Sequence, residues 1–161
     1  FMKTGRIDGV EFELVRRDGA AFFVSLNATA IYGEGGEYLM SRSTLFDITE
    51  RKRNDRRMHF LQTAMLETSE AEDTTAALAV VLRRICEFTG WSYGQAWLPN
   101  ADGSRLGLSE AWYCRAPQLR QFREQNEALS ITSDNILVGG VWKSQQPAWA
   151  WDLGPDPRFV R

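Results

Sequence analysis

Apolar and polar residues alternate along the first 48 positions of the chain. The runs 10–17 and 20–32 each carry apolar side chains at every second position, which is the period of a β-strand with one buried face. Asp18-Gly19 between them predicts a hairpin with a type I′ turn, which needs positive φ at both central residues. A GEGG turn and a third alternating run follow, so we expect a three-stranded antiparallel meander. The expected inward face of the middle strand is Phe22, Val24, Leu26, Ala28 and Ala30.

The period changes from two to about 3.5 residues after Asp47, which indicates a helix. Asp47 and Glu50 have the spacing of a capping box, in which Asp47 accepts from the first turn and Glu50 reaches back. Neither Gly nor Pro separates strand from helix, so we interpret Asp47, Thr49 and Glu50 as a junction that transmits strain. A weakly apolar seam with coiled-coil spacing follows, at Met58, Leu61 and Met65. A helix with so weak an apolar seam is marginally stable alone and needs a partner helix. We therefore expect a homodimer that forms through this helix.

The remaining residues mix helical and β-like patterns. Apolar positions at helical spacing between Thr74 and Gly90 predict a helix that ends at the glycine. The further elements expected are two strands around an Asp102-Gly103 loop, an amphipathic helix over 116–129, a short helix over 136–145 and a strand over 147–153. The fold class is therefore α+β: an antiparallel meander, a long linker helix, and an α/β sheet with flanking helices.

Composition and charge exclude several classes of protein. The 161 residues are 43% hydrophobic and 25% charged, as in ordinary globular domains. A net charge of −2 gives no electrostatic footprint for nucleic acid, and the basic run 51–57 lacks interleaved aromatics, so it is interpreted as a solvated helix face. No run of about 18 apolar residues and no signal-peptide pattern is present. With only two cysteines, the expectation is a cytoplasmic protein without a membrane segment.

Candidate catalytic and metal-binding residues are few. His59 is the only histidine, and an acidic neighbour and a following Thr-Pro, typical of a kinase phosphoacceptor, are missing, so we interpret it as a solvated side chain. One histidine and two separated cysteines match no metal spacing, and Cys86 on an apolar helix face predicts a buried thiol. The sequence therefore predicts no catalytic residue, no metal site and no required cofactor.

Six tryptophans leave two interpretations open, a filled core or a ligand cage. Aromatic residues usually fill a core. If a small-molecule pocket exists, its expected wall is Trp149 and Trp151, which would share a strand face, together with Trp112. Gly139-Gly140 lacks the Lys-Ser/Thr ending of a phosphate loop and predicts close packing.

Two parts of the chain resemble known signalling domains. The Arg-Arg-Asp-Gly turn at 16–19 and the Asp-Ile-Thr-Glu-Arg end at 47–51, closing a meander, resemble the C-terminal half of a PAS domain with its PAC motif. The stretches RRICEFTGWSYGQAWLPNADG and VGGVWKSQQPAWAWDLGPDPRF are similar to the N-terminal part of a GAF domain. The resemblance implies a PAS half over 1–48, a signalling helix over 49–72 and a GAF part over 73–161, both domains being incomplete.

The resemblance also implies a function. PAS–helix–GAF chains occur in bacterial sensor histidine kinases and cyclic-di-GMP signalling proteins, so we expect a non-catalytic sensory module that relays a change through a dimeric helix. The alternative is a regulatory fragment of a sensor histidine kinase, diguanylate cyclase or phosphodiesterase whose GAF part binds a small molecule. Attachment of a bilin at Cys114 is disfavoured, since Arg115 rather than His follows it.

Overall fold

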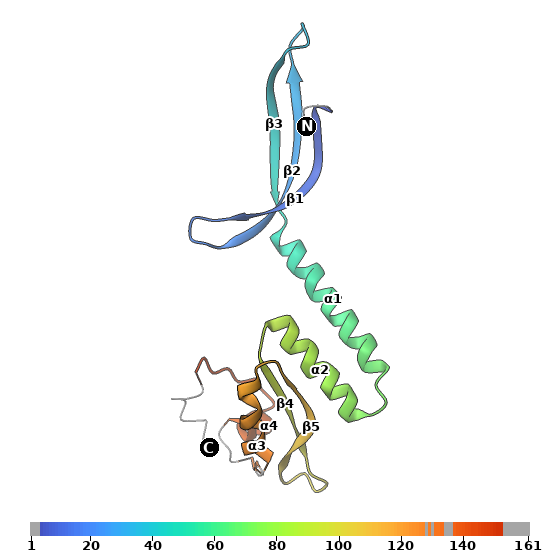
Figure 1. The fold of residues 1–161 in the computed structure, drawn as a ribbon, viewed down its shortest axis with the longest axis vertical. Helices are drawn as coiled ribbons and strands as arrows, with labels where there is room; N and C mark the ends of the chain where they lie inside the picture. Colours follow the sequence, from blue (N-terminus) through green and yellow to red (C-terminus); the bar gives the residue numbers. More distant parts are fainter. Residues whose placement is uncertain (1–3, 128, 130, 134–136, 153–161) are drawn as a thin grey trace. The chain divides into compact units, whose positions relative to one another are not determined.

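The computed structural model describes residues 4–152, apart from residues 128, 130 and 134–136. Over these residues the chain is a mixed α+β protein with four α-helices and two antiparallel sheets, of three and two strands (Figure 1). The α+β class predicted from the sequence is confirmed at this level. The chain divides into two compact units, residues 1–61 and 62–161.

The first unit is built on a meander whose central strand is β2. Its strands are β1 (Arg6–Val15), β2 (Ala21–Tyr32) and β3 (Tyr38–Asp47). Val24 and Ala28 of β2 are the buried apolar residues of this sheet. A bulge in β1 at Gly9, with φ of 63°, shifts the pairing with β2. The side-chain oxygen of Asn27 accepts a hydrogen bond from the Gly9 N–H at 2.7 Å, so the bulge keeps a partner for its backbone.

The two hairpin turns differ from the type I′ geometry predicted at Asp18-Gly19. Gly19 has φ of 85° and its N–H donates to the Arg16 carbonyl at 2.9 Å, whereas Asp18 does not have positive φ. The Asp18 carboxylate instead accepts from the Ala20 N–H at 2.9 Å. This is a type I turn closed by a left-handed glycine, and Gly36, with φ of 80°, closes the β2–β3 turn in the same way. The type I′ prediction was wrong because the Asp18 side chain satisfies a forward backbone N–H, a role that needs no positive φ.

Helix α1 (Thr49–Ser69) follows β3 with only Ile48 between them. The division between the two units falls inside it, and none of its residues is buried. The helix ends three residues before the predicted end at 72, where the Ser69 hydroxyl donates to the Leu66 carbonyl at 2.7 Å. A helix of this length with no buried face owes little of its stability to packing.

The second unit packs one helix against a two-stranded hairpin (Figure 1). Its elements are α2 (Thr74–Thr89), β4 (Tyr93–Pro99), β5 (Leu106–Cys114), the 3-10 turn η1 (Pro117–Leu119), α3 (Arg120–Glu127) and α4 (Val138–Ser144). The Asp73 carboxylate caps α2 by accepting from the Ala76 N–H at 2.7 Å, and Gly90, with φ of 79°, ends it as predicted. Cys86, Leu106 and Ala111 are buried in its core.

The strand predicted over 147–153 is not formed. Residues 147–152 have no sheet partner in the structure, and Leu153 lies outside the described residues. The alternation of tryptophan and small residues suggested a strand, but Trp149 and Trp151 both lie exposed. Pro147 supplies no N–H for a ladder, and no apolar face is buried that would hold the segment in a sheet.

Candidate functional site

The junction between β3 and α1 is fixed by hydrogen bonds to the backbone of Phe23 in β2. The Ile48 N–H donates to the Phe23 carbonyl at 2.9 Å, and the Thr49 hydroxyl accepts from the Phe23 N–H at 3.0 Å. The Asp47 carboxylate accepts from the Thr49 N–H at 2.9 Å. The sheet ladder thus continues through the Thr49 side chain into the first residue of the helix. Asp47 and Thr49, predicted as junction residues, are brought together here.

Glu50 does not complete the predicted capping box. Its carboxylate pairs with the Arg53 guanidinium at 2.8 Å, one turn further into the helix. The helix begins at Thr49, and the Ile48 carbonyl accepts its first bond, from the Lys52 N–H at 2.9 Å. Ile48 is therefore the cap residue, and Asp47 lies one position before it. The capping-box prediction failed because Glu50 lies at the second position of the helix, where Arg53 offers an exposed partner.

A second tether joins the helix to β1, and sequence reasoning missed it. The Glu11 carboxylate pairs with the Lys52 ammonium at 2.5 Å and with the Arg51 guanidinium. Hydrogen bonding from Lys52, with a further contribution from Arg51, lowers the pKa of Glu11 below its ordinary value. The signal in the sequence was a carboxylate on the polar face of β1 and a basic run 40 residues later. Only the register of the sheet brings the two together.

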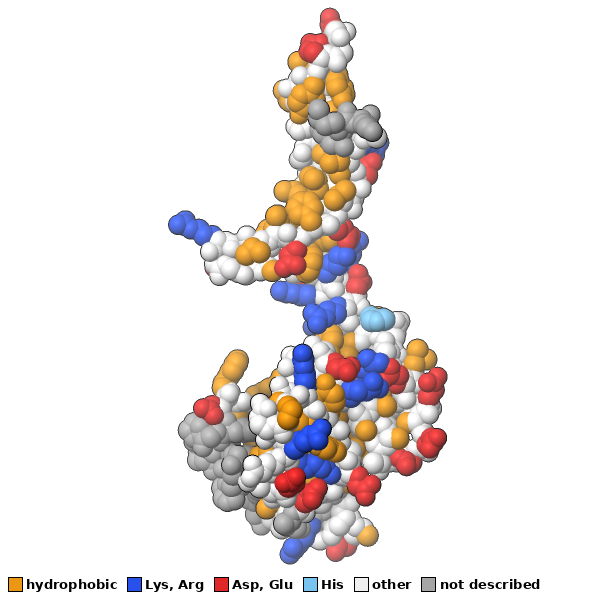
Figure 2. Space-filling model, in the orientation of Figure 1, with side chains coloured by type: hydrophobic (Ala, Val, Ile, Leu, Met, Phe, Trp, Pro, Cys, Tyr) orange, Lys and Arg blue, Asp and Glu red, His pale blue; other side chains and the backbone are white. Residues whose placement is uncertain are grey.

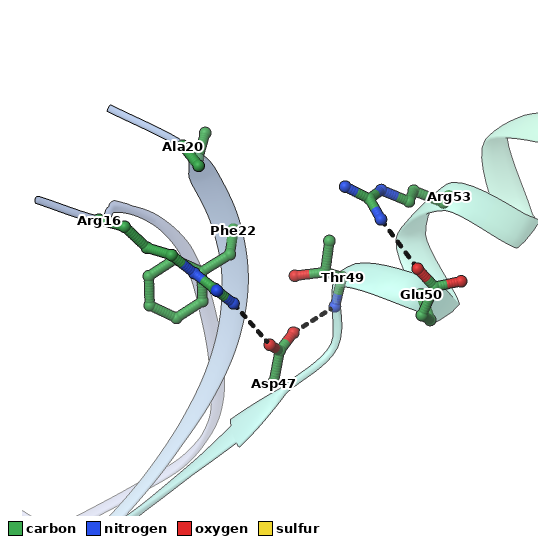
Figure 3. Close-up of a pocket in the computed structure, with 8 residues that line it drawn as sticks. Arg16, Ala20, Phe22, Asp47, Thr49, Glu50 and Arg53 are labelled. Atoms are coloured by element: carbon green, nitrogen blue, oxygen red, sulfur yellow. Dashed lines mark hydrogen bonds and ion pairs between the residues drawn. The ribbon is translucent and has the colours of Figure 1, made fainter. Parts of the chain in front are cut away.

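A cavity of about 400 Å³ lies beside the junction (Figure 3). It is lined by Arg16, Ala20, Ala21, Phe22, Asp47, Thr49, Glu50 and Arg53. The Arg16 guanidinium lies 3.8 Å from the Asp47 carboxylate and 5.0 Å from the centre of the Phe22 ring. Two arginines and two carboxylates balance the charge of the lining. A group entering this cavity would contact the carboxylate that holds the first turn of the helix.

The predicted seam residues lie together on α1 and are solvent-exposed. Met58, Leu61 and Met65 follow one stripe of the helix at three- and four-residue spacing, and each is at least 49% exposed. His59 is exposed as well, as expected for a solvated side chain. The structure therefore presents the seam as an uncovered apolar stripe.

The predicted tryptophan wall is not assembled. Trp112 lies in β5, with the Arg123 guanidinium 5.0 Å from its ring centre and Tyr93 6.3 Å away. Trp149 contacts Trp91 edge-on at 5.9 Å, and Trp151 is fully exposed. Because the strand expected to align Trp149 and Trp151 does not form, these residues share no face with Trp112.

Other tryptophans line a cavity of about 480 Å³ in the second unit. It lies between the hairpin and α4, and its lining consists of Trp97, Pro99, Leu106, Val138, Val141, Trp142, Gln145, Gln146 and Pro147. Gln145 has φ of 54°, and its backbone N–H donates to the Val141 carbonyl at 2.9 Å, which ends the helix. The lining is mostly apolar, with two side-chain amides, which suits a small, largely apolar ligand. Sequence reasoning noted Trp97 and Trp142 only as members of the tryptophan set.

The two cysteines differ in their surroundings. Cys86 is buried as predicted, and burial raises the pKa of its thiol above the ordinary value. The Cys114 thiol donates to the Ala116 carbonyl at 3.0 Å. Gly139 is buried within α4, in keeping with a packing role. Neither thiol is placed in a catalytic arrangement by these contacts.

Within the described ranges, no group of three His, Cys, Asp or Glu side chains lies close enough to hold a metal ion. The helices that the structure describes include none with the length and apolar character needed to cross a membrane. No protein-family model matches the chain, and no curated protein sequence is similar to it.

The charge of Asp47 is expected to make the junction sensitive to acid. The hydroxyl and backbone N–H of Thr49, with a weaker effect of Arg16, lower the pKa of Asp47 below its ordinary value of 3.8. A carboxylate with a lowered pKa stabilises the folded state above that ordinary value, and the stabilisation is lost as the pH falls through the folded-state pKa. Asp47→Asn should therefore lower the melting temperature at pH 7 but converge with the wild type below pH 3.8.

The measurement is the thermal midpoint of both proteins between pH 7 and pH 2.5. Asn retains a carbonyl acceptor for the Thr49 N–H, so the comparison isolates the charge. A difference in midpoint that stays constant across this range would contradict the expectation.

Proposed function

We propose that the chain is a non-catalytic sensory module of a bacterial signalling protein, which relays a change in its first unit through helix α1. The observation that carries the proposal is the junction, which has no flexible spacer: the Asp47 carboxylate accepts from the Thr49 N–H, and the Thr49 hydroxyl accepts from the Phe23 N–H of β2. A glycine-rich hinge would dissipate a displacement of β3. A continuous ladder transmits it to the first turn of the helix.

The sequence resemblance supports this role. The PAC-like end at 47–51 lies at the junction just described, and the chain following α1 resembles the start of a GAF domain. In this proposal the residues 1–48 are a PAS half, 49–72 a signalling helix and 73–161 a GAF part, in a cytoplasmic protein.

The output of the relay is a change in how two copies of α1 pack. The exposed stripe of Met58, Leu61 and Met65 is the surface available for a second copy. Its apolar content is low, and two packing arrangements of such a seam differ by only a few kcal/mol. A displacement of β3 that shifts the first turn of α1 can therefore favour one arrangement over the other.

Light scattering over a concentration series tests the seam. We expect the wild-type chain to self-associate and Met58→Glu/Leu61→Glu to raise the dissociation constant at least about tenfold, since each dimer would bury four added carboxylates. Leu66→Glu is the matched control, because Leu66 is also exposed but lies about 100° around the helix from the stripe. An unchanged association curve for the double variant would contradict the proposal that two copies of α1 associate through this stripe.

The alternative is a regulatory fragment whose GAF-like part binds a small molecule. The cavity between Trp97 and Trp142 favours it, because it offers two aromatic walls and side-chain amides in a mostly apolar lining. In this alternative the ligand acts on the second unit, and the parent is a sensor histidine kinase or a cyclic-di-GMP enzyme.

A further inference from the structure

The last turns of α1 place a carboxylate against two arginines of α2. The Glu67 carboxylate accepts from the Arg84 Nε–H at 2.8 Å and from the Arg84 Nη2–H, so one guanidinium binds both of its oxygens. The Arg83 guanidinium donates to the same carboxylate at 3.0 Å, and Arg84 is itself held by Glu87 at 3.2 Å on its own helix. Hydrogen bonding from Arg84 lowers the pKa of Glu67 below its ordinary value. We call these four residues the Glu67 clamp.

The clamp lies entirely within the second unit. This unit begins at residue 62, inside α1, and only residues 70–73 connect that helix to α2. A connection of this length makes two helices antiparallel neighbours, as the end of α1 and α2 are (Figure 1). The end of α1 therefore forms a helical hairpin with α2, and the clamp crosses between the two helices. A bidentate arginine–carboxylate pair fixes orientation as well as distance.

The end of α1 has its polar side turned inward in this hairpin. Glu67 faces α2, and Thr63 and Ala64, one turn earlier on the same side, are half-buried like it. The large apolar residues Met65 and Leu66 are 75% and 65% exposed. Met65 lies about 160° around the helix axis from Glu67, on the opposite side. A surface helix normally turns its apolar side inward, so this orientation requires an interaction that holds the polar side there.

The side of α2 that carries the arginines also offers apolar contact. Val80 and Ala77 lie one and two turns before Arg84 on the same side of α2, and both are partly exposed. Turning the end of α1 to bring Met65 against them would bury apolar surface. The same turn would take Glu67 out of reach of its arginines. The hairpin thus has two competing arrangements, and the ion pairs select one of them.

We propose that the Glu67 clamp fixes the rotation of the end of α1 about its axis, with Met65 directed away from α2. The inference deepens the proposed function and rests on it in one respect. A turn of α1 that starts at the junction must be carried or opposed by a contact at the other end of the helix, and the clamp is that contact. The clamp itself belongs to the second unit, so it is tested without reference to the relay.

Hydrogen exchange in the full chain measures the strength of the clamp. Glu67→Gln keeps the size of the side chain and removes its charge. We expect the amides of residues 63–69 to exchange at least about threefold faster than in the wild type, because the last turns of α1 open more often. Arg84→Lys should give most of this increase, since lysine lacks the planar fork. Arg83→Gln should give less, since Arg83 supplies one contact where Arg84 supplies two.

Glu70→Gln is the matched control. Charged side chains of both signs are interspersed over the second unit (Figure 2), so the control must remove one carboxylate charge outside the clamp. Glu70 is exposed and lies just after the end of α1, three residues beyond Glu67. This variant should leave the exchange of residues 63–69 unchanged. Far-ultraviolet circular dichroism checks that each variant folds.

A second measurement reports the rotation itself. The chain has four methionines, so labelling the methionine methyl groups gives a simple NMR spectrum. A soluble paramagnetic agent broadens each methyl signal according to its exposure. The Met65 signal should be broadened strongly in the wild type, since that side chain is 75% exposed. In Glu67→Gln its broadening should fall at least about twofold relative to that of Met40 in β3, because the apolar side of the helix turns toward α2.

The outcomes separate the clamp from the relay. Unchanged exchange at 63–69 in Glu67→Gln, or an equal rise in Glu70→Gln, would overturn the clamp. Faster exchange with unchanged broadening of Met65 would overturn its role in rotation, since the helix would then detach without turning. A failure of the relay alone looks different: Asp47→Asn at the junction would leave the Met65 signal as in the wild type, while Glu67→Gln would still alter it.

Discussion

Replacing Leu106 with alanine is expected to lower the free energy of unfolding of the second unit by about 2–5 kcal/mol. Leu106 is 4% exposed, and its backbone is fixed on both sides, because its N–H donates to the Ile131 carbonyl at 2.7 Å and its carbonyl accepts from the Ile131 N–H at 3.0 Å. A residue held in this way cannot move to fill the space left by the lost methyl groups. The space would join the adjacent cavity beside Trp97 and Trp142.

Leu98→Ala is the control for this prediction. Leu98 lies in the same hairpin, opposite Gly107, but is 39% exposed, so its truncation should cost less than about 1 kcal/mol. Urea unfolding followed by tryptophan fluorescence measures both variants against the wild type. Equal losses would show that Leu106 is not a core residue of this unit.

The elements with strong local signals were predictable from the sequence. Helix α2 has both ends marked, by Asp73 before it and Gly90 after it, and both caps are present in the structure. The meander was predictable because alternation over ten or more residues admits no other regular structure. The segment at 147–152 shows the limit of such reasoning. A short run with alternating tryptophans forms a strand only where a neighbouring strand can pair with it, and the sequence does not show whether such a neighbour exists.

The junction was half predictable, for a physical reason. Asp47 and Thr49 act on backbone groups within two residues or on the adjacent strand, and local sequence marks such interactions well. Glu11 is tied to α1 across 40 residues, and this depends on the register of β1 against β2. The Glu50 carboxylate had two possible partners: a backbone N–H before the helix, as in a capping box, or the Arg53 guanidinium one turn later. Both interactions are exposed and similar in strength, so the sequence alone does not decide between them.

The candidate pocket was the least predictable part. Six tryptophans raised the question, but which of them share a cavity is set by how α4 meets the hairpin. Trp97 and Trp142 meet there although 45 residues separate them. Residues that come together by long-range packing leave no periodic pattern in the local sequence. Trp149 and Trp151 were predicted to form a pocket wall because they would share the face of a strand, and that strand is absent.

Gly94→Ala is expected to lower the free energy of unfolding by about 1–3 kcal/mol, because the added methyl group overpacks the contact between β4 and α2. A Cβ at Gly94 would lie 2.9 Å from the Cys86 sulfur and 3.5 Å from a methyl group of Leu82. Gly107→Ala is the matched control in the paired strand, where a Cβ meets no atom within 4 Å, and it should cost nothing. Equal losses in the two variants would mean that the contact with Cys86 does not set the effect.

The double variant Gly94→Ala/Cys86→Ala tests the cause of that loss directly. Cys86→Ala alone removes a buried sulfur and leaves a gap, and Gly94→Ala alone adds a methyl group where that sulfur lies. Together the new methyl group occupies the vacated space, so the double variant should be more stable than the sum of the two losses by at least about 1 kcal/mol. Urea unfolding of the four proteins gives this coupling energy. If the two losses add within about 0.5 kcal/mol, the helix moves to accept the methyl group, and the contact between α2 and the hairpin is softer than its geometry indicates.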